Sequence, residues 1–488
     1  MEIAPRHRFV WLARFVVFAL PLLCSPASMA TRPHRMVFAH YMLANQDYEP
    51  NDPTGERNIT SYEREIRQAQ SIGIDGFALN AGGWFKEPRY IRRASQMFEA
   101  AYRLHSNFKL MLSADMCCSN DATDVEDMVR RFANHPRYSA IYYKHNGRFV
   151  LTTFSGSSHG PAFWQQLRDD LEKGTHPSQQ AAPGALSTAS GISSSAPLCL
   201  ELIPAFFWGG ELPTAANIQA GLDDYTSIID GAFYWGIAGV PGLGHAPDQL
   251  PSSEAYASVL HTAGKIYMAP ICFQFWGANA GRYYEYSGYS GMRAMWINAI
   301  RVTHPDWVEI ITWNDFVEGT YVSPIDDPAK YAGANDLDAG AAPPSTLSFY
   351  HSHRGATELL AYFIQWYKTG HQPAIRNDTI YWAYRTQLAP DPTSATTIKQ
   401  YGPVANVVYI TANLTAPATL LVTFGNTTKA IDLPAGSTDV EAPILSGYAP
   451  HFVLTRGKAQ LTQATGDDAV TTEQLAPNFY YSTGSAHD

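Results

Sequence analysis

Two carboxylates three residues apart, Asp315 and Glu318, follow a strongly apolar stretch of the chain. Residues 310–312 are typical of the end of a buried β-strand, and Trp313-Asn314-Asp315 comes directly after them. Two carboxyl groups held close together can differ in pKa, so that one donates a proton while the other accepts one. Hydrolysis of a glycosidic bond needs such a pair. We therefore predict that Asp315 and Glu318 are catalytic, the alternative being a solvated turn.

Eight short apolar runs, the last of which carries this acid pair, alternate with segments of helical periodicity. Each run is continuously hydrophobic, as in strands buried on both faces. The predicted strands are residues 36–42, 75–81, 108–115, 148–154, 199–207, 230–236, 265–275 and 307–313. The predicted helices are residues 61–72, 90–104, 123–132, 160–172, 214–228, 253–263, 290–303 and 350–368. This alternation predicts an α/β fold, a (β/α)8 TIM barrel over residues 31–371.

The pattern changes after residue 371. Short β-rich runs at 406–411, 419–424, 451–455 and 478–482 are separated by Pro, Gly and Asn. They predict a C-terminal antiparallel β-sandwich domain over residues 372–488. Two segments interrupt the barrel pattern: residues 174–197 read as a flexible insertion, and residues 325–346 form a long loop for which a substrate-covering role is one interpretation.

In a TIM barrel the functional groups lie at the C-terminal ends of the strands. Polar and aromatic residues occupy these ends in this chain, with few Lys or Arg and no glycine-rich phosphate cradle. That mixture suits a neutral sugar polymer. The predicted substrate-binding residues are His40, Tyr41, Asn80, Asp115, Trp208, Tyr234, Trp235, Trp276, Trp313 and Asn314. Asp115 is also an alternative partner for Glu318 in place of Asp315.

We predict no catalytic metal and no cofactor. His40 lacks a second His or Cys at ligand spacing, so hydrogen bonding or packing is its expected role. The cysteines after residue 30 do not form a disulfide scaffold, and one bridge or buried free thiols are both compatible with them. A formal net charge of −10 argues against nucleic acid as a partner. We expect a monomer whose partner is its polysaccharide substrate.

Residues 1–30 have the features of a secretory signal peptide. Arg6, Arg8 and Arg14 precede an apolar stretch over residues 15–24, and the small residues of 28–30 suit cleavage. The apolar stretch is short for a membrane span. We therefore predict a secreted protein, extracellular or periplasmic, without membrane association after cleavage.

Several ordered segments resemble glycoside hydrolase family 71, the α-1,3-glucanases or mutanases. The segments are MVFAHYM (36–42), GIDGFALNAG (73–82), Ser113-Ala114-Asp115, IDGAFYW (229–235), Tyr267-Met268-Ala269-Pro270, WVEIITWNDFVEG (307–319) and NFYYSTG (478–484). The resemblance implies endo-acting hydrolysis of α-1,3-glucan in a (β/α)8 barrel, with inversion at the anomeric carbon. A Trp-Asn-Asp-x-x-Glu pattern that is common in the family matches Trp313, Asn314, Asp315 and Glu318.

By analogy with a related endo-mannosidase family, Glu318 is assigned as the general acid and Asp315 as the base. The chain departs from the family pattern at residues 236–241, where a Trp-rich segment is common, and at Phe316-Val317, where Tyr-Gly is common. These departures concern the linkage and subsite preferences. Hydrolysis of another α-linked polysaccharide such as α-mannan, and non-catalytic polysaccharide binding, remain the alternatives.

Overall fold

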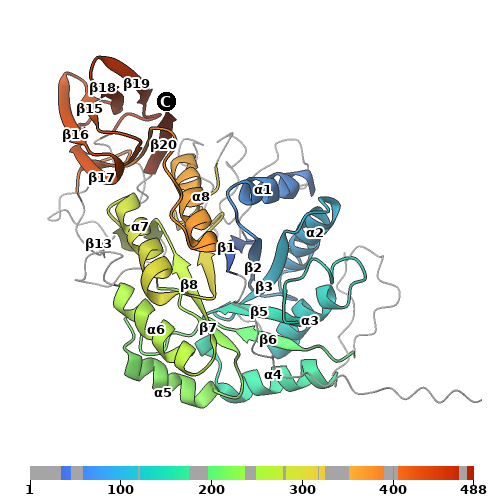
Figure 1. The fold of residues 1–488 in the computed structure, drawn as a ribbon. Helices are drawn as coiled ribbons and strands as arrows, with labels where there is room; N and C mark the ends of the chain where they lie inside the picture. The colour runs from blue at the N-terminus through green and yellow to red at the C-terminus, as the bar shows by residue number, and fades with distance from the viewer. Residues whose placement is uncertain are drawn as a thin grey trace, which may run out of the picture. The chain divides into compact units, whose positions relative to one another are not determined.

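The computed structural model describes most of the chain after residue 34 (Figure 1). The described residues are 35–44, 59–118, 121–174, 196–210, 212–236, 249–277, 282–316, 318–324, 351–388, 399–400, 405–471 and 481–488. The side chains of 276–277, 282–285 and 399–400 are not among them. The predicted signal peptide, most of the insertion at 174–197 and the loop 325–346 lie outside the described residues.

Eight parallel strands form a curled sheet of the TIM type, as predicted. Their hydrogen-bonded order is β6-β5-β3-β2-β1-β11-β8-β7, so that the first strand of the chain lies beside the last strand of this sheet. The strands are β1 (Met36–Met42), β2 (Gly76–Ala81), β3 (Lys109–Asp115), β5 (Arg148–Phe154), β6 (Leu200–Ile203), β7 (Gly231–Phe233), β8 (Ile266–Ile271) and β11 (Trp307–Ile310). Nearly all of their residues are buried, which explains the continuous hydrophobicity of the eight runs.

Strands β6 and β7 meet at the weakest seam of the sheet. Their pairing is a single parallel bridge between Ala205 and Phe233, with the Phe233 amide donating to Pro204 O at 2.9 Å. Proline has no N–H to return to the ladder. Asp230 adds further links between the two strands, because its amide donates to Leu202 O at 2.9 Å. Its carboxylate accepts the Leu202 amide at 2.9 Å and pairs with Arg148 at 3.2 Å.

A helix follows each of the eight strands, and the ring of helices surrounds the sheet (Figure 1). The helices are α1 (Ile59–Ser71), α2 (Arg89–Arg103), α3 (Ala122–Ala133), α4 (Pro161–Lys173), α5 (Ala215–Tyr225), α6 (Leu250–Thr262), α7 (Tyr289–Asn298) and α8 (Arg354–Thr369). Their apolar faces are buried: α2, for example, buries Ile91, Ala94 and Phe98 against the core. The helix predictions are confirmed to within a few residues at each end.

One predicted strand, residues 265–275, is two strands in the structure. β8 ends at Ile271, and the separate β9 (Gln274–Gly277) pairs antiparallel with β10 (Arg282–Glu285). At the break the Cys272 thiol donates to Gln274 O at 2.9 Å. The apolar run continued through the break, so periodicity alone did not reveal it.

The residues after α8 form two four-stranded antiparallel sheets with a shared apolar core, which confirms the predicted sandwich. One sheet has the order β17-β14-β12-β20 and the other β16-β15-β18-β19. The strands are β12 (Thr379–Arg385), β14 (Val407–Leu414), β15 (Ala418–Phe424), β16 (Thr427–Leu433), β17 (Gly436–Pro443), β18 (His451–Arg456), β19 (Ala459–Thr465) and β20 (Tyr481–His487). In the part of the chain that the structure describes, we find no helix long and apolar enough to cross a membrane.

Candidate functional site

The acid pair lies on a tight loop that follows β11 and is fixed on both sides. Its ascending limb is bound to β1, because the Trp313 amide donates to His40 O at 2.7 Å. Its two limbs are bound to each other by the Thr312 amide, which donates to Thr320 O at 3.1 Å, and by the Thr312 and Thr320 hydroxyls, 3.0 Å apart. The loop therefore belongs to the rigid frame of the barrel.

Asp315 and Glu318 are brought together at this loop. The Asp315 amide donates to the Thr312 hydroxyl at 2.8 Å, and the Glu318 amide donates to Asp315 Oδ1 at 3.0 Å. Asp315 is buried, at 6% exposure, while Glu318 is half-buried. A backbone N–H donated to a carboxylate stabilises its charged form. The two carboxyl groups thus occupy different environments within one turn.

Asn314 fastens the same loop to the end of β1. Its Oδ1 accepts the Met42 amide at 2.7 Å, and its Nδ2 donates to Met42 O at 3.0 Å. The side-chain amide thus makes the two hydrogen bonds that the backbone of a neighbouring strand would make to Met42. The side chain that we predicted to contact substrate has both ends engaged with the backbone, so it holds the loop that carries Asp315 against β1.

His40 and Glu309 form a buried pair beneath the acid loop. His40 Nδ1 lies 2.6 Å from Glu309 Oε1, and both side chains are almost fully buried. Among the described residues, His40 Nε2 and Glu309 Oε2 have no hydrogen-bond partner. The Trp235 ring, half-buried, meets His40 edge-on at 4.7 Å and Phe154 at 4.8 Å. This arrangement offers a polar nitrogen beside an aromatic surface.

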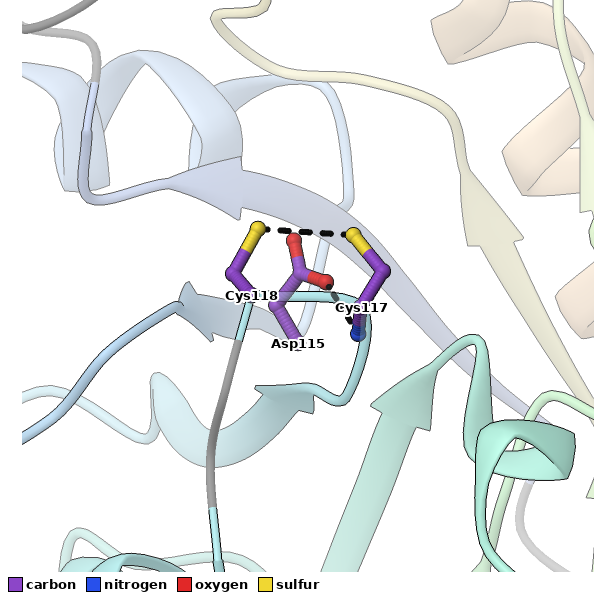
Figure 2. A group of neighbouring side chains, drawn as sticks. All are labelled: Asp115, Cys117 and Cys118. Carbon is purple, nitrogen blue, oxygen red and sulfur yellow. Dashed lines mark hydrogen bonds between the residues drawn. The ribbon is translucent and has the colours of Figure 1, made fainter.

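Asn80 and Asp115 lie at the ends of the neighbouring strands β2 and β3. Asn80 Nδ2 donates to Asp115 Oδ2 at 3.4 Å, and the Cys117 amide donates to Asp115 Oδ1 at 3.3 Å. Figure 2 shows the carboxylate between the side chains of Cys117 and Cys118. The structure thus places these two predicted residues together, and two cysteines that we had not assigned to the site lie beside them.

Four predicted aromatic residues lie in the core instead. Tyr41 and Trp313 are fully buried and pack on Phe77, and Tyr234 stacks on Tyr256 at 4.8 Å. Side chains alternate between the two faces of a strand, so Tyr41 and Tyr234 point away from the face of His40 and Trp235.

Trp208 is buried between α5 and α6. It packs on Phe206 and Tyr225, beside Gly221. We therefore leave Tyr41, Trp208, Tyr234 and Trp313 out of the proposed substrate-binding set. The side chain of Trp276 lies outside the described residues.

Three further residues near the acid loop were missed in the sequence. Gln274 Nε2 donates to Gly319 O at 2.6 Å, which fixes the residue after Glu318. Burial, and after it the nearby Glu318 carboxylate, raise the pKa of the Cys272 thiol to about 12. Glu309 lies in the middle of a buried strand, and a charge there requires a partner. That requirement was the available signal for Glu309.

One group of side chains has the composition of a partial metal site. Asp115, Cys117 and Cys118 offer donor atoms that all lie within 4.8 Å of one another. Closed structural zinc sites have four donors. These three therefore fall short of such a site, and the expectation that the chain uses no catalytic metal stays a prediction.

The family profile and the sequence relatives agree with one another on a family. Residues 33–487 match the sequence profile described as glycosyl hydrolase family 71. The glucan endo-1,3-alpha-glucosidase agn1 of Schizosaccharomyces pombe is 25% identical over 490 residues, covering 96% of this chain and 99% of its own. A mutanase of Penicillium rubens is 26% identical, covering 94% of this chain and 93% of its own. A solved GH99 endo-alpha-mannosidase of Bacteroides thetaiotaomicron aligns with a TM-score of 0.46 at 11% identity, over 69% of this chain and 98% of its own.

Proposed function

Because the chain belongs to glycosyl hydrolase family 71, we propose that it cleaves the α-1,3-glucosidic bonds of α-1,3-glucan. The observation that carries the proposal is the turn that holds Asp315 and Glu318 at the end of β11, in a chain that matches this family over residues 33–487. Both relatives named above are α-1,3-glucan hydrolases by name or class, and they align over almost the whole chain.

The two carboxyl groups divide the chemistry between them. Asp315 is the base, because its Oδ1 already accepts an amide hydrogen bond that favours the ionised form. It removes a proton from the attacking water while Glu318 donates its proton to the bridging oxygen. The bond from the anomeric carbon to that oxygen breaks as the new bond to the water oxygen forms. An attack of this kind inverts the anomeric configuration, and it needs carboxyl groups about 6.5–9.5 Å apart.

The remaining groups of the site bind a neutral sugar. His40 Nε2 is a polar atom without a hydrogen-bond partner among the residues that the structure describes. Trp235 offers a ring face or edge, and Asp115 and Asn80 offer hydrogen bonds to hydroxyl groups. Stacking of sugar rings on aromatic side chains and hydrogen bonds to hydroxyls need no basic residues. The site therefore fits a polyol polymer, with endo action as the form of cleavage that we propose.

Reducing-sugar release from insoluble α-1,3-glucan tests the assignment. Asp315→Asn and Glu318→Gln should each lower the rate by about 100-fold or more, the usual contribution of general acid–base catalysis. Asp223→Asn and Glu441→Gln are matched controls, because both carboxylates are exposed and lie far from this loop in the chain. Full activity in both site variants would show that the acid pair is misassigned.

Two further measurements refine the proposal. NMR of the products at early times should show β-configured ends, and α-configured ends would exclude inversion. A panel containing α-1,3-glucan, α-1,4-glucan and α-mannan should show cleavage of the first; cleavage of mannan alone would replace the proposed substrate. Glucan binding without turnover would instead favour a binding protein.

We also propose export, on the basis of the predicted signal peptide. When the full chain is expressed in a host that exports proteins, the protein recovered from the culture medium should begin near residue 31, as read by N-terminal sequencing. Retention of Met1 inside the cell would contradict the proposal.

A further inference from the structure

Two adjacent cysteines lie at the edge of the candidate site, on the turn that follows β3. Cys117 Sγ and Cys118 Sγ are 3.3 Å apart, and both residues are exposed (Figure 2). Neighbouring side chains on a chain usually diverge, so this approach of the two sulfurs is uncommon. We propose that Cys117 and Cys118 are a redox site, a dithiol that oxidises to a disulfide between adjacent residues and thereby repositions Asp115.

The backbone of the turn holds the two sulfurs in place. The Cys118 amide donates to Asp115 O at 3.2 Å, which closes a four-residue turn. The Gly83 amide donates to Cys118 O at 3.2 Å, so the loop after β2 fixes the far side of the turn. Both sides of the turn are fixed while the sulfurs are not bonded to each other. Because neighbouring Cα atoms are about 3.8 Å apart, closer than in most disulfides, a bond of about 2.05 Å requires the peptide between the two cysteines to rotate.

The two thiols also differ in reactivity. The hydrogen bond between the two thiols lowers the pKa of the Cys118 thiol, while that same bond and burial raise the pKa of the Cys117 thiol. The thiolate is the nucleophile in thiol chemistry, so Cys118 is the attacking sulfur and Cys117 the resolving one. Exposure of both residues gives access to a small oxidant.

The reaction needs a small-molecule disulfide such as oxidised glutathione as the oxidant. The Cys118 thiolate attacks one sulfur of that disulfide, forms a mixed disulfide and expels the other half as a thiolate. Cys117 then loses its proton and attacks the Cys118 sulfur, which expels the second half. Two cysteine thiols are thus oxidised, and one small disulfide is reduced to two thiols.

Asp115 responds because its carboxylate is bonded to the same turn. Oδ1 accepts the Cys117 amide at 3.3 Å, while Oδ2 accepts from Asn80 at 3.4 Å. Drawing the sulfurs into a covalent bond rotates the peptide that joins Cys117 to Cys118, whose N–H donates to Asp115 O. That rotation also shifts Cys117 and its own amide, the donor of the Oδ1 hydrogen bond. The effect on sugar cleavage rests on the proposed function, whereas the disulfide itself does not.

The first test is chemical. Full-length protein is treated with oxidised glutathione, unfolded in acid, alkylated and digested with trypsin. The peptide of residues 110–130 contains both cysteines and no other, and residues 266–282 supply the buried Cys272 as an internal control. We expect residues 110–130 to lose two hydrogen atoms and escape alkylation, while Cys272 is alkylated. Cys117→Ser and Cys118→Ser should each abolish the loss.

Two outcomes would overturn the assignment. Alkylation of both thiols after oxidant treatment would show that the turn cannot close into a disulfide. Zinc that survives dialysis and protects both thiols from oxidation would assign the cluster to metal binding instead.

The second test compares the two redox forms on α-1,3-glucan. We expect the oxidised form to release sugar roughly tenfold more slowly, which corresponds to about 1.4 kcal/mol, and dithiothreitol to restore the rate. Cys118→Ser, which lacks the attacking thiolate, should be insensitive to both reagents. Equal rates in the two forms would refute the coupling to Asp115. If neither form cleaves the glucan, the proposed function fails, while the peptide masses still decide the disulfide.

Discussion

Asn314 provides a sharp test of how the acid loop is held. Two side-chain hydrogen bonds join it to the Met42 backbone, and the residue is 1% exposed. Asn314→Ala leaves a buried amide and a buried carbonyl without these partners, at about 1–3 kcal/mol each, so a loss of about 3 kcal/mol is a conservative expectation. Unfolding a barrel of roughly 340 residues has an entropy of about 0.7 kcal/mol per degree, so Tm should fall by about 4 °C.

Asn314→Asp separates the two hydrogen bonds. The new carboxyl can still accept the Met42 amide, but its second oxygen then faces Met42 O, where Nδ2 now donates at 3.0 Å. Burial and this repulsion disfavour the charged form, so the folded state holds the proton to a higher pH than the unfolded state does. The stability of the variant should therefore fall as pH rises and should be regained in acid, where the protonated carboxyl donates to Met42 O.

Thermal unfolding followed by near-UV circular dichroism at pH 7 and pH 4.5 measures both effects. Asn107→Ala and Asn107→Asp are the controls, because Asn107 is exposed. Glucan cleavage should decline in both Asn314 variants through kcat more than KM, since the loop positions Asp315 without contacting substrate. Equal Tm values for Asn314→Ala and Asn107→Ala, or no recovery of Asn314→Asp in acid, would refute the reasoning.

Three other substitutions test separate parts of the structure. Trp235→Ala should raise KM about tenfold by removing roughly 1–2 kcal/mol of apolar contact with the sugar, measured by initial rates; an unchanged KM would remove the ring from the site. Gly221→Ala should destabilise by about 1–3 kcal/mol in chemical unfolding despite its gain in helix propensity, because the new methyl would lie 2.4 Å from the Trp208 ring; a stabilised variant would contradict that packing. Burial lowers the pKa of His353 to about 3, so the unfolded state binds the extra proton below pH 6.5. Stability should thus fall by about 2.3 kcal/mol more in the wild type than in His353→Asn between pH 6.5 and pH 4.5, and parallel pH profiles would show that His353 is not the group responsible.

Much of the barrel could be predicted from the sequence because its strands are buried on both faces. The continuous apolar runs 36–42 and 148–154 are strands with those same bounds in the structure. The two-residue strand β4 (Lys144–His145) has no apolar run of its own. It is a strand only because it forms an antiparallel hairpin with β5. The hairpin of β9 and β10 was hidden for a different reason, since its first strand continues the apolar run of β8.

The site was harder to predict than the fold. Position at a strand end correctly grouped Asn80 with Asp115, but it could not say which face of a strand a side chain occupies. Adjacent residues such as His40 and Tyr41 point to opposite faces, and one lies beside Trp235 while the other lies in the core. Glu309 is a buried charge in β11, so it marks the polar face of that strand. Counting side-chain alternation from it would have been a better guide to which face each residue occupies.

The seam between β6 and β7 gives the ring one joint of a different kind. Elsewhere neighbouring strands are held by amide-to-carbonyl ladders, whose strength hardly depends on dissolved ions. At this joint Asp230 gathers Arg148, Arg168 and the Leu202 amide. Counter-ions weaken such attractions, most at the half-exposed edge. A high salt concentration should therefore speed amide hydrogen–deuterium exchange at this joint first, while the amides of the other seven strand pairs stay protected.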